Sequence, residues 1–355
     1  MFRRILIAAI LVVSLVVVAC GAASSTKLSP CSNARTEAVP SPDGTQIAYY
    51  GTRWPPPTSH GNPNSILQAF CVTDASGNDP RPLKYTVCSE KCQDFPYQIS
   101  WTSAGALLYV VDGPVLRMTP GSKPEKTGIR INAPSFSLDA AGNRLASGAN
   151  FPGCATCAGP VSVFDLSTGA LIGNVGGKKV DNMAPSLSPD GSQVAFERDP
   201  STDAGKPLGI WIAKADGSGL RRLESKGFGP LWSPAGNEIA YRTSGYSSGL
   251  SVVSPHGGKA RTLVGKGVAA VYGWSPNGKL IAVETGSRTY RVAVVDVASG
   301  KVRNVLATPT FVSSANWTPD SKSLIAITNP IRRSQCTNLY RVPAAGGKAT
   351  LLRHC

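Results

Sequence analysis

The stretch SPDGTQIAY at Ser41–Tyr49 decides the fold, because versions of it recur along the whole chain. Pro42 fixes φ for a turn, Asp43 can cap that turn, and Gly44 tolerates a positive φ. The apolar run that follows is typical of a β-strand entering a core. Each copy therefore predicts the end of one strand, a tight turn and the start of the next strand.

Seven copies of this motif can be aligned. Clear copies lie at 41–49, 188–196, 232–241, 274–283 and 317–327, and degraded copies lie at 101–109 and 136–146. The motif glycine, or Ser321 in the last copy, stands at 44, 105, 142, 191, 236, 278 and 321, so the steps are 61, 37, 49, 45, 42 and 43 residues. Steps of this size suit a unit of four short strands.

A second pattern follows the later copies. An apolar run, a Gly-containing turn and another short apolar run lie at 210–223, 250–263, 292–305 and 339–352. Each of these segments predicts a β-hairpin, which brings the repeat to four strands. No window shows a sustained helical periodicity of apolar residues, so helix content should be very low.

These motifs resemble the PD40, or WD40-like, repeats of the TolB-type β-propeller family, and the likeness covers residues 40–353. The resemblance implies an all-β fold, with a single propeller of four-stranded blades around a central channel. Seven copies favour seven blades. Six blades are the alternative, if one degraded copy is a decoration. A propeller does not by itself specify a function.

The first residues resemble a bacterial lipoprotein signal. A basic head at 3–4 precedes an apolar run at 5–18, and VVACG at 17–21 resembles a lipobox. The resemblance implies cleavage before Cys20 and a lipid on its sulfur; the alternative is an ordinary signal peptide cut nearby. The expected divisions are a signal peptide at 1–19, a lipidated flexible tether at 20–38 and the propeller at 39–355.

This signal sequence predicts an exported protein, anchored by lipid to the outer face of the cell membrane. The chain has 36 Lys and Arg against 21 Asp and Glu, a formal net charge of +15. An exported basic domain can attract anionic lipids or acidic envelope polymers, although scattered charge also suits plain solvation. We expect a monomer that binds a protein or an envelope polymer and does not bind nucleic acid.

Eight further cysteines accompany the exported part, namely Cys31, Cys71, Cys88, Cys92, Cys154, Cys157, Cys336 and Cys355. An even number in an exported chain predicts up to four disulfides. The cheapest local pairs are Cys88–Cys92, Cys154–Cys157 and Cys336–Cys355, which leaves Cys31–Cys71. Zinc or redox chemistry at the CxxC of 154–157 is the alternative, but a zinc site needs four suitably spaced ligands.

The motifs of known propeller enzymes are weak in this chain. Its three histidines, His60, His256 and His354, are too scattered for the His-rich metal centre of the similar PD40-type oligogalacturonate lyases. The GxSxG match at 245–249 joins two expected strands, whereas a nucleophile elbow joins a strand to a helix. We expect no catalytic residue, no metal and no cofactor.

The function expected is therefore a binding scaffold at the cell envelope. The longest steps place insertions at 80–98 and 148–160, which carry four of the cysteines. These loops are candidate interaction surfaces; the alternative is that their disulfides only stabilise long loops. The rival function is a polysaccharide lyase or hydrolase, which acidic residues with shifted pKa values in the channel would favour.

Overall fold

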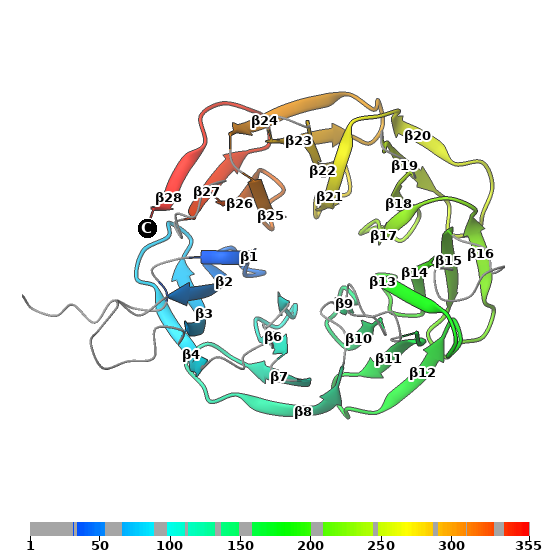
Figure 1. The fold of residues 1–355 in the computed structure, drawn as a ribbon, viewed down its shortest axis with the longest axis horizontal. Coiled ribbons are helices and arrows are strands. Elements are labelled where there is room, and N and C mark those ends of the chain that lie inside the picture. Colours follow the sequence, from blue (N-terminus) through cyan, green and yellow to red (C-terminus); the bar gives the residue numbers. More distant parts are fainter. Residues whose placement is uncertain are drawn as a thin grey trace, which may run out of the picture.

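Seven four-stranded antiparallel sheets form a closed ring in the computed structural model (Figure 1). The structure describes residues 31, 34–53, 66–88, 98–110, 113–131, 136–148, 158–199, 209–243, 248–286, 290–309, 311–329 and 337–354. The prediction of an all-β propeller with seven blades is confirmed. These residues contain no α-helix, and hence no helix long and apolar enough to cross a membrane.

The strands of each blade follow one another along the chain, from the axis of the ring outward (Figure 1). Blade 1 contains β1 (Ala34–Pro40), β2 (Gln46–Arg53), β3 (Ile66–Asp74) and β4 (Arg81–Cys88); blade 2 contains β5 (Ile99–Trp101), β6 (Leu107–Val110), β7 (Pro114–Met118) and β8 (Glu125–Arg130); blade 3 contains β9 (Phe136–Leu138), β10 (Arg144–Ser147), β11 (Val161–Asp165) and β12 (Leu171–Val175).

The remaining blades keep the same order. Blade 4 contains β13 (Asp181–Leu187), β14 (Gln193–Asp199), β15 (Gly209–Lys214) and β16 (Arg221–Glu224); blade 5 contains β17 (Phe228–Trp232), β18 (Ile239–Arg242), β19 (Leu250–Val253) and β20 (Arg261–Val264); blade 6 contains β21 (Val268–Trp274), β22 (Leu280–Thr285), β23 (Tyr290–Asp296) and β24 (Val302–Thr308); blade 7 contains β25 (Phe311–Trp317), β26 (Ser323–Asn329), β27 (Asn338–Pro343) and β28 (Thr350–His354).

Each predicted motif lies across the turn between the first and second strands of a blade. The degraded copies at 101–109 and 136–146 belong to blades 2 and 3, so neither is a decoration. All four predicted hairpins are present, as the third and fourth strands of blades 4 to 7. The first strand begins at Ala34, which precedes residue 39, the boundary expected from the sequence.

The polar residues of the motif close its turn. The Ser41 hydroxyl donates to Asp43 Oδ1 over 2.5 Å and accepts the backbone N–H of Gln46 over 2.9 Å. Asp43 Oδ1 also accepts the N–H of Thr45. Ser188 and Asp190 repeat this arrangement in blade 4. The motif recurs because its side chains replace backbone hydrogen bonds that a tight turn leaves unmade.

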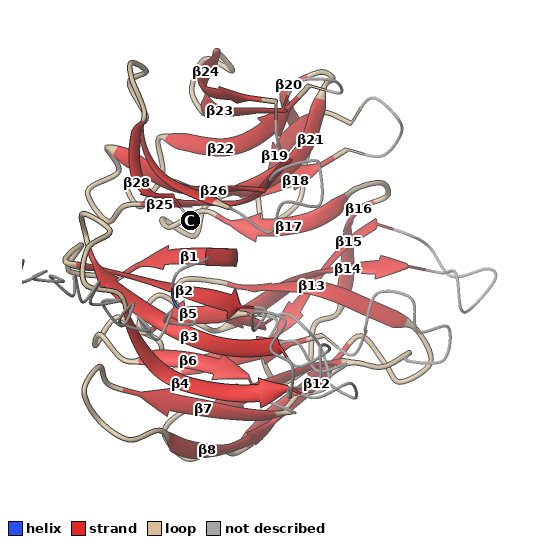
Figure 2. Cartoon of the chain, turned by 60° about the vertical axis from the view of Figure 1, so that its left-hand side comes forward, coloured by secondary structure: helices blue, strands red, loops and turns tan. Residues whose placement is uncertain are grey.

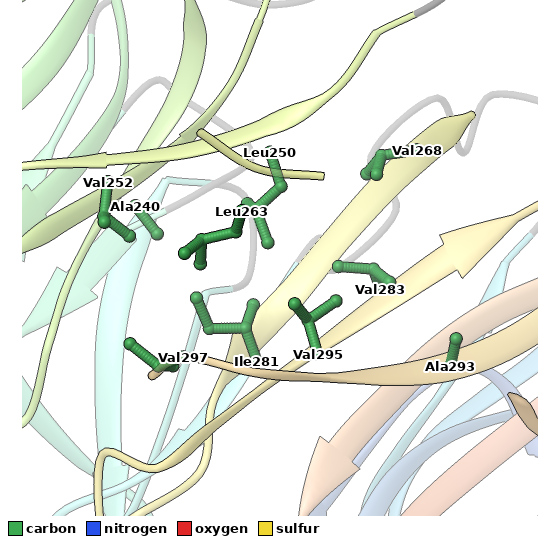
Figure 3. Close-up of a cluster of buried hydrophobic side chains, with 10 residues drawn as sticks. All are labelled: Ala240, Leu250, Val252, Leu263, Val268, Ile281, Val283, Ala293, Val295 and Val297. Carbon is green, nitrogen blue, oxygen red and sulfur yellow. The ribbon is translucent and has the colours of Figure 1, made fainter. Parts of the chain in front are cut away.

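Apolar side chains fill the space between neighbouring blades. Figure 3 shows one such cluster, in which Leu250 and Val252 of blade 5 meet Ile281 and Val283 of blade 6. The side chain of Ala282, between them in β22, points to the other face of the sheet and packs against blade 7. Alternation along one central strand therefore supplies two interfaces, and the small alanine of the motif allows the sheets to approach closely.

Blade 7 closes the ring against blade 1 without exchanging a strand, because every sheet is built from one continuous segment. β1 lies beside β25 and β26, as Figure 2 also shows. Ile325 and Ile327 of blade 7 share a buried cluster with Ile47 and Tyr49 of blade 1. The Asn316 side chain donates to the carbonyl of Ala38 over 3.0 Å.

One disulfide reinforces this closure. Cys31 precedes β1 and bonds to Cys71 of β3, which confirms the predicted Cys31–Cys71 pair. Both cysteines are fully buried, in the cluster that joins blades 7 and 1. The Tyr49 hydroxyl donates to the Cys31 carbonyl over 2.7 Å. Cys31 is therefore attached to the propeller, although it lies within 20–38, where the sequence predicts a flexible tether.

Candidate functional site

The propeller presents two different faces. The motif turns and the hairpin turns between third and fourth strands lie at the same ends of the blades, and we call this the turn face. At the opposite face the chain passes from second to third strands and from one blade to the next. The insertion predicted at 80–98 is wrong in part, because Arg81–Cys88 form β4. Residues 89–97 and 149–157 of the two predicted insertions lie outside the described residues.

Most of the cysteines and histidines singled out in the sequence also lie outside the described residues. Cys20, Cys92, Cys154, Cys157, Cys336, Cys355 and His60 lie outside the described residues, as does the side chain of Cys88. His256 is exposed in a hairpin turn on the turn face, and the backbone of His354 ends β28 at the opposite face, with its side chain outside the described residues. The structure therefore does not bring His256 and His354 together. Among the residues that the structure describes, no group of three His, Cys, Asp or Glu side chains could hold a metal ion.

Polar groups near the axis bond one blade to the next. Strands at the edge of a sheet carry unpaired N–H groups, which need acceptors. Side chains of the preceding blade supply them in five cases: Ile99 N–H to Glu37, Phe136 N–H to Gln98, Leu187 N–H to Ser137, Gly229 N–H to Glu197 and Trp232 N–H to Ser186, at 3.2, 2.5, 3.0, 3.1 and 3.0 Å. These polar side chains near the axis thus hold the ring together.

Glu37 is the carboxyl near the axis with the most altered acidity. Burial raises its pKa to about 7, and the hydrogen bond from Ile99 only partly offsets that effect. Because the folded pKa exceeds the ordinary glutamate value of 4.5, folding favours the protonated acid. Stability should therefore fall as pH rises from about 4.5 to about 7 and change little from this group above that range.

We expect Glu37→Gln to weaken this pH dependence. Glutamine cannot ionise, yet its carbonyl can still accept the Ile99 N–H. A shift from 4.5 to about 7 corresponds to at most about 3 kcal/mol lost by the wild type between pH 4 and pH 8. Urea unfolding of both proteins at the two pH values measures the difference. Equal pH dependence in both would contradict the assignment.

A second carboxyl near the axis is engaged by a tyrosine. The Tyr272 hydroxyl of β21 donates to Glu284 Oε2 of β22 over 2.6 Å, and Glu284 is buried. Burial and the neighbouring carboxylate raise the pKa of Tyr272, so this hydroxyl stays protonated at neutral pH. Both residues belong to blade 6, and the Tyr272 hydroxyl also lies 3.4 Å from the Val312 carbonyl oxygen of blade 7, its second, longer acceptor.

The motif tryptophans connect blades through their indole N–H groups. Trp101, Trp274 and Trp317 donate to carbonyls of the preceding innermost strand, at Val39, Leu231 and Gly273, over 2.9, 3.0 and 3.1 Å. Trp232 occupies the same motif position, but its buried indole nitrogen has no hydrogen-bond partner in the described structure. This difference between two similar residues provides a matched test.

We expect Trp274→Phe to cost about 1 to 2 kcal/mol more than Trp232→Phe. The first change leaves the Leu231 carbonyl without its donor, whereas the second removes an N–H that makes no bond. Both changes replace the indole by the same smaller ring. Urea unfolding measures the two losses, and a larger loss at Trp232 would show that packing, not the hydrogen bond, governs these positions.

The aspartates of the motif serve the turns. Hydrogen bonds from Ser41, Ser188 and Thr318 lower the pKa values of Asp43, Asp190 and Asp320, respectively. Asp165, in the hairpin turn of blade 3, has a pKa of about 2 because Ser167 and Thr168 donate to it. These carboxylates are ionised at neutral pH and occupied by their own loops, so they are poor proton donors or acceptors for catalysis.

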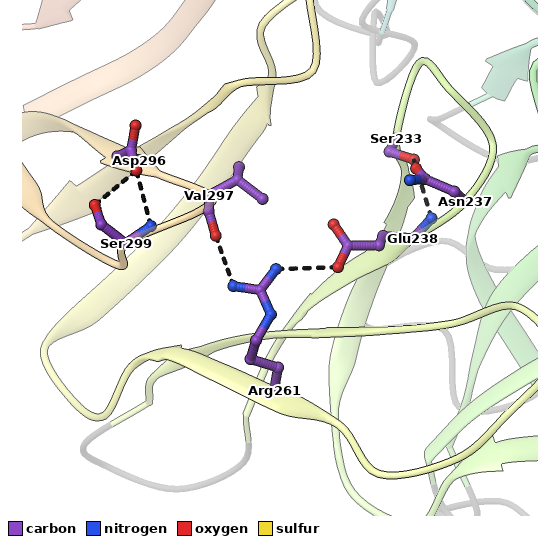
Figure 4. Close-up of polar contacts among 7 residues, drawn as sticks. All are labelled: Ser233, Asn237, Glu238, Arg261, Asp296, Val297 and Ser299. Carbon is purple, nitrogen blue, oxygen red and sulfur yellow. Dashed lines mark hydrogen bonds and ion pairs between the residues drawn. The ribbon is translucent and has the colours of Figure 1, made fainter.

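Arginines at the start of the outer strands bind the next blade. Arg261 of β20 donates to the Val297 carbonyl, in the hairpin turn of blade 6, over 2.6 Å and pairs with Glu238 over 3.0 Å (Figure 4). Arg221 likewise binds the Pro255 carbonyl, and Arg303 binds that of Ala344 over 3.2 Å. We call these the inter-blade arginine contacts.

The corresponding junction between blades 1 and 2 is open. Arg81 of β4 is the cross-strand neighbour of Val72 in β3, just as Arg261 of β20 is the cross-strand neighbour of Val252 in β19. Instead of reaching blade 2, Arg81 pairs with Asp79 of its own hairpin over 2.6 Å, and both side chains are largely exposed. A cleft of about 400 Å³ lies here, between Arg81 on one side and Pro120 and Gly121 on the other.

A second hollow of about 330 Å³ adjoins this cleft. Both are lined by Thr45, Gln46 and Pro120, and the second extends to Trp101 and Gly105. We call the two together the blade 1–2 cleft. It lies on the turn face, and its lining residue Val72 belongs to the buried cluster between blades 1 and 2, in which the ring centroids of Phe70 and Tyr109 are 4.4 Å apart.

Comparison with known proteins identifies the architecture only. No family model and no curated protein sequence matches the chain. An oligogalacturonate lyase from Vibrio parahaemolyticus aligns with a TM-score of 0.64 at 12% identity, over 88% of this chain and 89% of that one. An oligogalacturonate lyase in complex with manganese gives 0.64 at 15% identity, over 88% and 90%. A TolB structure from Agrobacterium tumefaciens gives 0.49 at 17%, over 68% and 91%. Likeness at such identities shows the fold alone.

Two features of the turn face were not expected from the sequence. Arginine stands at the start of the fourth strand in blades 4, 5 and 6, where scattered charge suggested only solvation. Its recurrence after the Gly-containing turn was visible and could have indicated a shared contact. The blade 1–2 cleft could not be foreseen, since it depends on how two hairpin turns sit across a junction.

Proposed function

We propose that this chain is an exported lipoprotein, modified on Cys20, whose propeller is a non-catalytic scaffold for a protein or an envelope polymer. The proposal is supported by the hydrogen bonds that the described polar side chains make within the propeller itself. Those near the axis bond neighbouring blades, and the motif aspartates bond their own turns. A rigid ring whose polar groups serve its structure is suited to present surfaces for binding.

Cys20→Ala tests the anchor. The wild type should incorporate a clickable fatty acid and sediment with membranes, whereas the variant should do neither. The same cells then provide a capture experiment, in which the mature wild type retains a defined protein or polymer after washing. Export of the wild type without label would contradict the lipoprotein assignment, and failure to retain either class would contradict the scaffold.

The alternative function is a propeller-type polysaccharide lyase or hydrolase. Glu37 is the observation that favours it, because a carboxyl near the axis with a pKa of about 7 could exchange protons near neutral pH. Glu37 already accepts the Ile99 N–H, however, and the shift is explained by burial. Turnover that disappears in Glu37→Gln, with the fold intact, would establish this alternative.

A further inference from the structure

The blade 1–2 cleft differs from the other junctions in both layers of the turn face. In blades 1, 5 and 6 the motif glycine lies near the motif proline of the preceding blade, so that a Cβ on Gly44, Gly236 or Gly278 would be 3.8, 3.5 or 4.0 Å from it. A Cβ on Gly105, the motif glycine of blade 2, would have nothing within 4 Å. The motif turns of blades 1 and 2 are therefore separated.

The hairpin turns show the same separation. A Cβ on Gly77, Gly169, Gly217 or Gly300 would lie 2.5 to 2.7 Å from a carbonyl oxygen in the outer strand of the preceding blade. The hairpin turn of blade 2 instead contains Pro120-Gly121, and a Cβ on Gly121 would have nothing within 4 Å. In blades 5 and 7 an arginine of the preceding blade takes this place, since a Cβ on Gly257 or Gly346 would lie 3.9 or 3.7 Å from Arg221 or Arg303. The hairpin turn of blade 2 shows neither kind of contact at Gly121.

The chemistry of the filled junctions indicates what the open one would accept. Where the junction is filled, a guanidinium binds a peptide carbonyl of an approaching turn, as Arg261 binds that of Val297. At the open junction Arg81 stands at the same register position, but Thr119, the counterpart of Val297, already accepts the N–H and the hydroxyl of Ser122 through its carbonyl. Pro120 and Gly121, which follow it, line the far wall of the cleft. A peptide unit of a ligand offers the carbonyl that the guanidinium of Arg81 does not find in blade 2.

We propose that the blade 1–2 cleft binds a turn or short extended segment of a partner protein, with Arg81 donating to a backbone carbonyl of that segment. This inference rests on the proposed scaffold function and names its site and partner class. Asp79 holds Arg81 in the free protein through an exposed ion pair, which a ligand can displace at little cost. Trp101 and Pro120 provide apolar walls for the side chains of the segment.

A library of random peptides displayed on phage, selected against the mature protein, is the probe. Enriched peptides are then synthesised and titrated against three variants. Arg81→Ala and Thr45→Trp should each raise Kd at least tenfold, because one removes the donor and the other fills the cleft. Arg261→Ala is the matched control: it breaks a filled junction and should lower thermal stability without changing Kd, whereas Arg81→Ala should leave thermal stability nearly unchanged.

Three results would overturn the proposal: no enriched peptide, peptides whose Kd ignores Arg81→Ala and Thr45→Trp, or binding of an oligosaccharide rather than a peptide in the cleft. The capture experiment tests the scaffold function and the cleft separately. If the wild type, Arg81→Ala and Thr45→Trp all retain the same partner, the scaffold function stands and the cleft is not its site. If the wild type retains nothing, the scaffold function itself is wrong.

Discussion

Replacing Cys31 and Cys71 together by alanine is expected to lower the free energy of unfolding by about 4 kcal/mol. The disulfide spans a sequence separation of 40 residues, and a crosslink over such a loop removes a large part of the freedom of the unfolded chain. The loss should also be local in origin, since both sulfurs lie in the cluster that joins blade 7 to blade 1. We expect the variant to fold but to unfold at markedly lower urea concentration.

Two controls sharpen this measurement. Reductant added to the double variant reports any stabilisation by the other cysteines, and reductant added to the wild type should reproduce at least the loss caused by the double substitution. Hydrogen exchange should show faster opening of β1 and β26 than of β14 in the variant. A loss below about 1 kcal/mol, or uniform loosening of all seven blades, would show that the disulfide does not hold the closure.

Gly77→Ala is expected to cost about 3 kcal/mol, the second largest effect among these predictions. Gly77 has φ +85° in the hairpin turn of blade 1, and an added Cβ would lie 2.7 Å from the Leu352 carbonyl oxygen of blade 7. Left-handed backbone alone costs an alanine about 1 to 2 kcal/mol, and the contact with Leu352 backbone adds to that cost. The Arg353 guanidinium also binds the Gly77 carbonyl over 3.1 Å, so the same junction would be disturbed twice.

Gly346→Ala separates strain from contact. Gly346 occupies the equivalent turn position in blade 7 with φ +89°, but its Cβ would meet only the Arg303 side chain, at 3.7 Å. The backbone strain is therefore matched, and we expect a loss of only about 1 to 2 kcal/mol. Equal losses in the two variants, measured by urea unfolding, would mean that blade 7 yields easily at Leu352 and that the closure is looser than its packing indicates.

The fold could be read from the sequence because its determinants are local. The SPDG phrase specifies its own turn through side-chain hydrogen bonds within five residues, and it recurs with a spacing that admits four strands. Degraded copies still formed blades 2 and 3, because β6 and β10 keep the buried apolar residues that fill the interfaces. Local patterns of this kind survive the loss of individual turn residues.

The contacts between blades were less accessible, because they join residues far apart in the chain. The bond from Asn316 to Ala38 closes the ring across almost the whole sequence, and no local pattern announces it. The pair Cys31–Cys71 was reached only as the remainder after local pairings, not from its position at the closure. The candidate site was missed for a related reason. The cleft exists because Arg81 bonds to Asp79 of its own hairpin and does not reach blade 2, which the sequence does not show.

The most direct test of the central claim is whether the protein binds without turning its ligand over. The mature wild type would be incubated with the envelope polymers and membranes of the cells that make it, and retention and polymer length would be measured on the same samples. The account predicts retention of a partner with no change in polymer length, in the wild type and in Glu37→Gln alike. Polymer shortened by the wild type and left intact by a folded Glu37→Gln variant would contradict it.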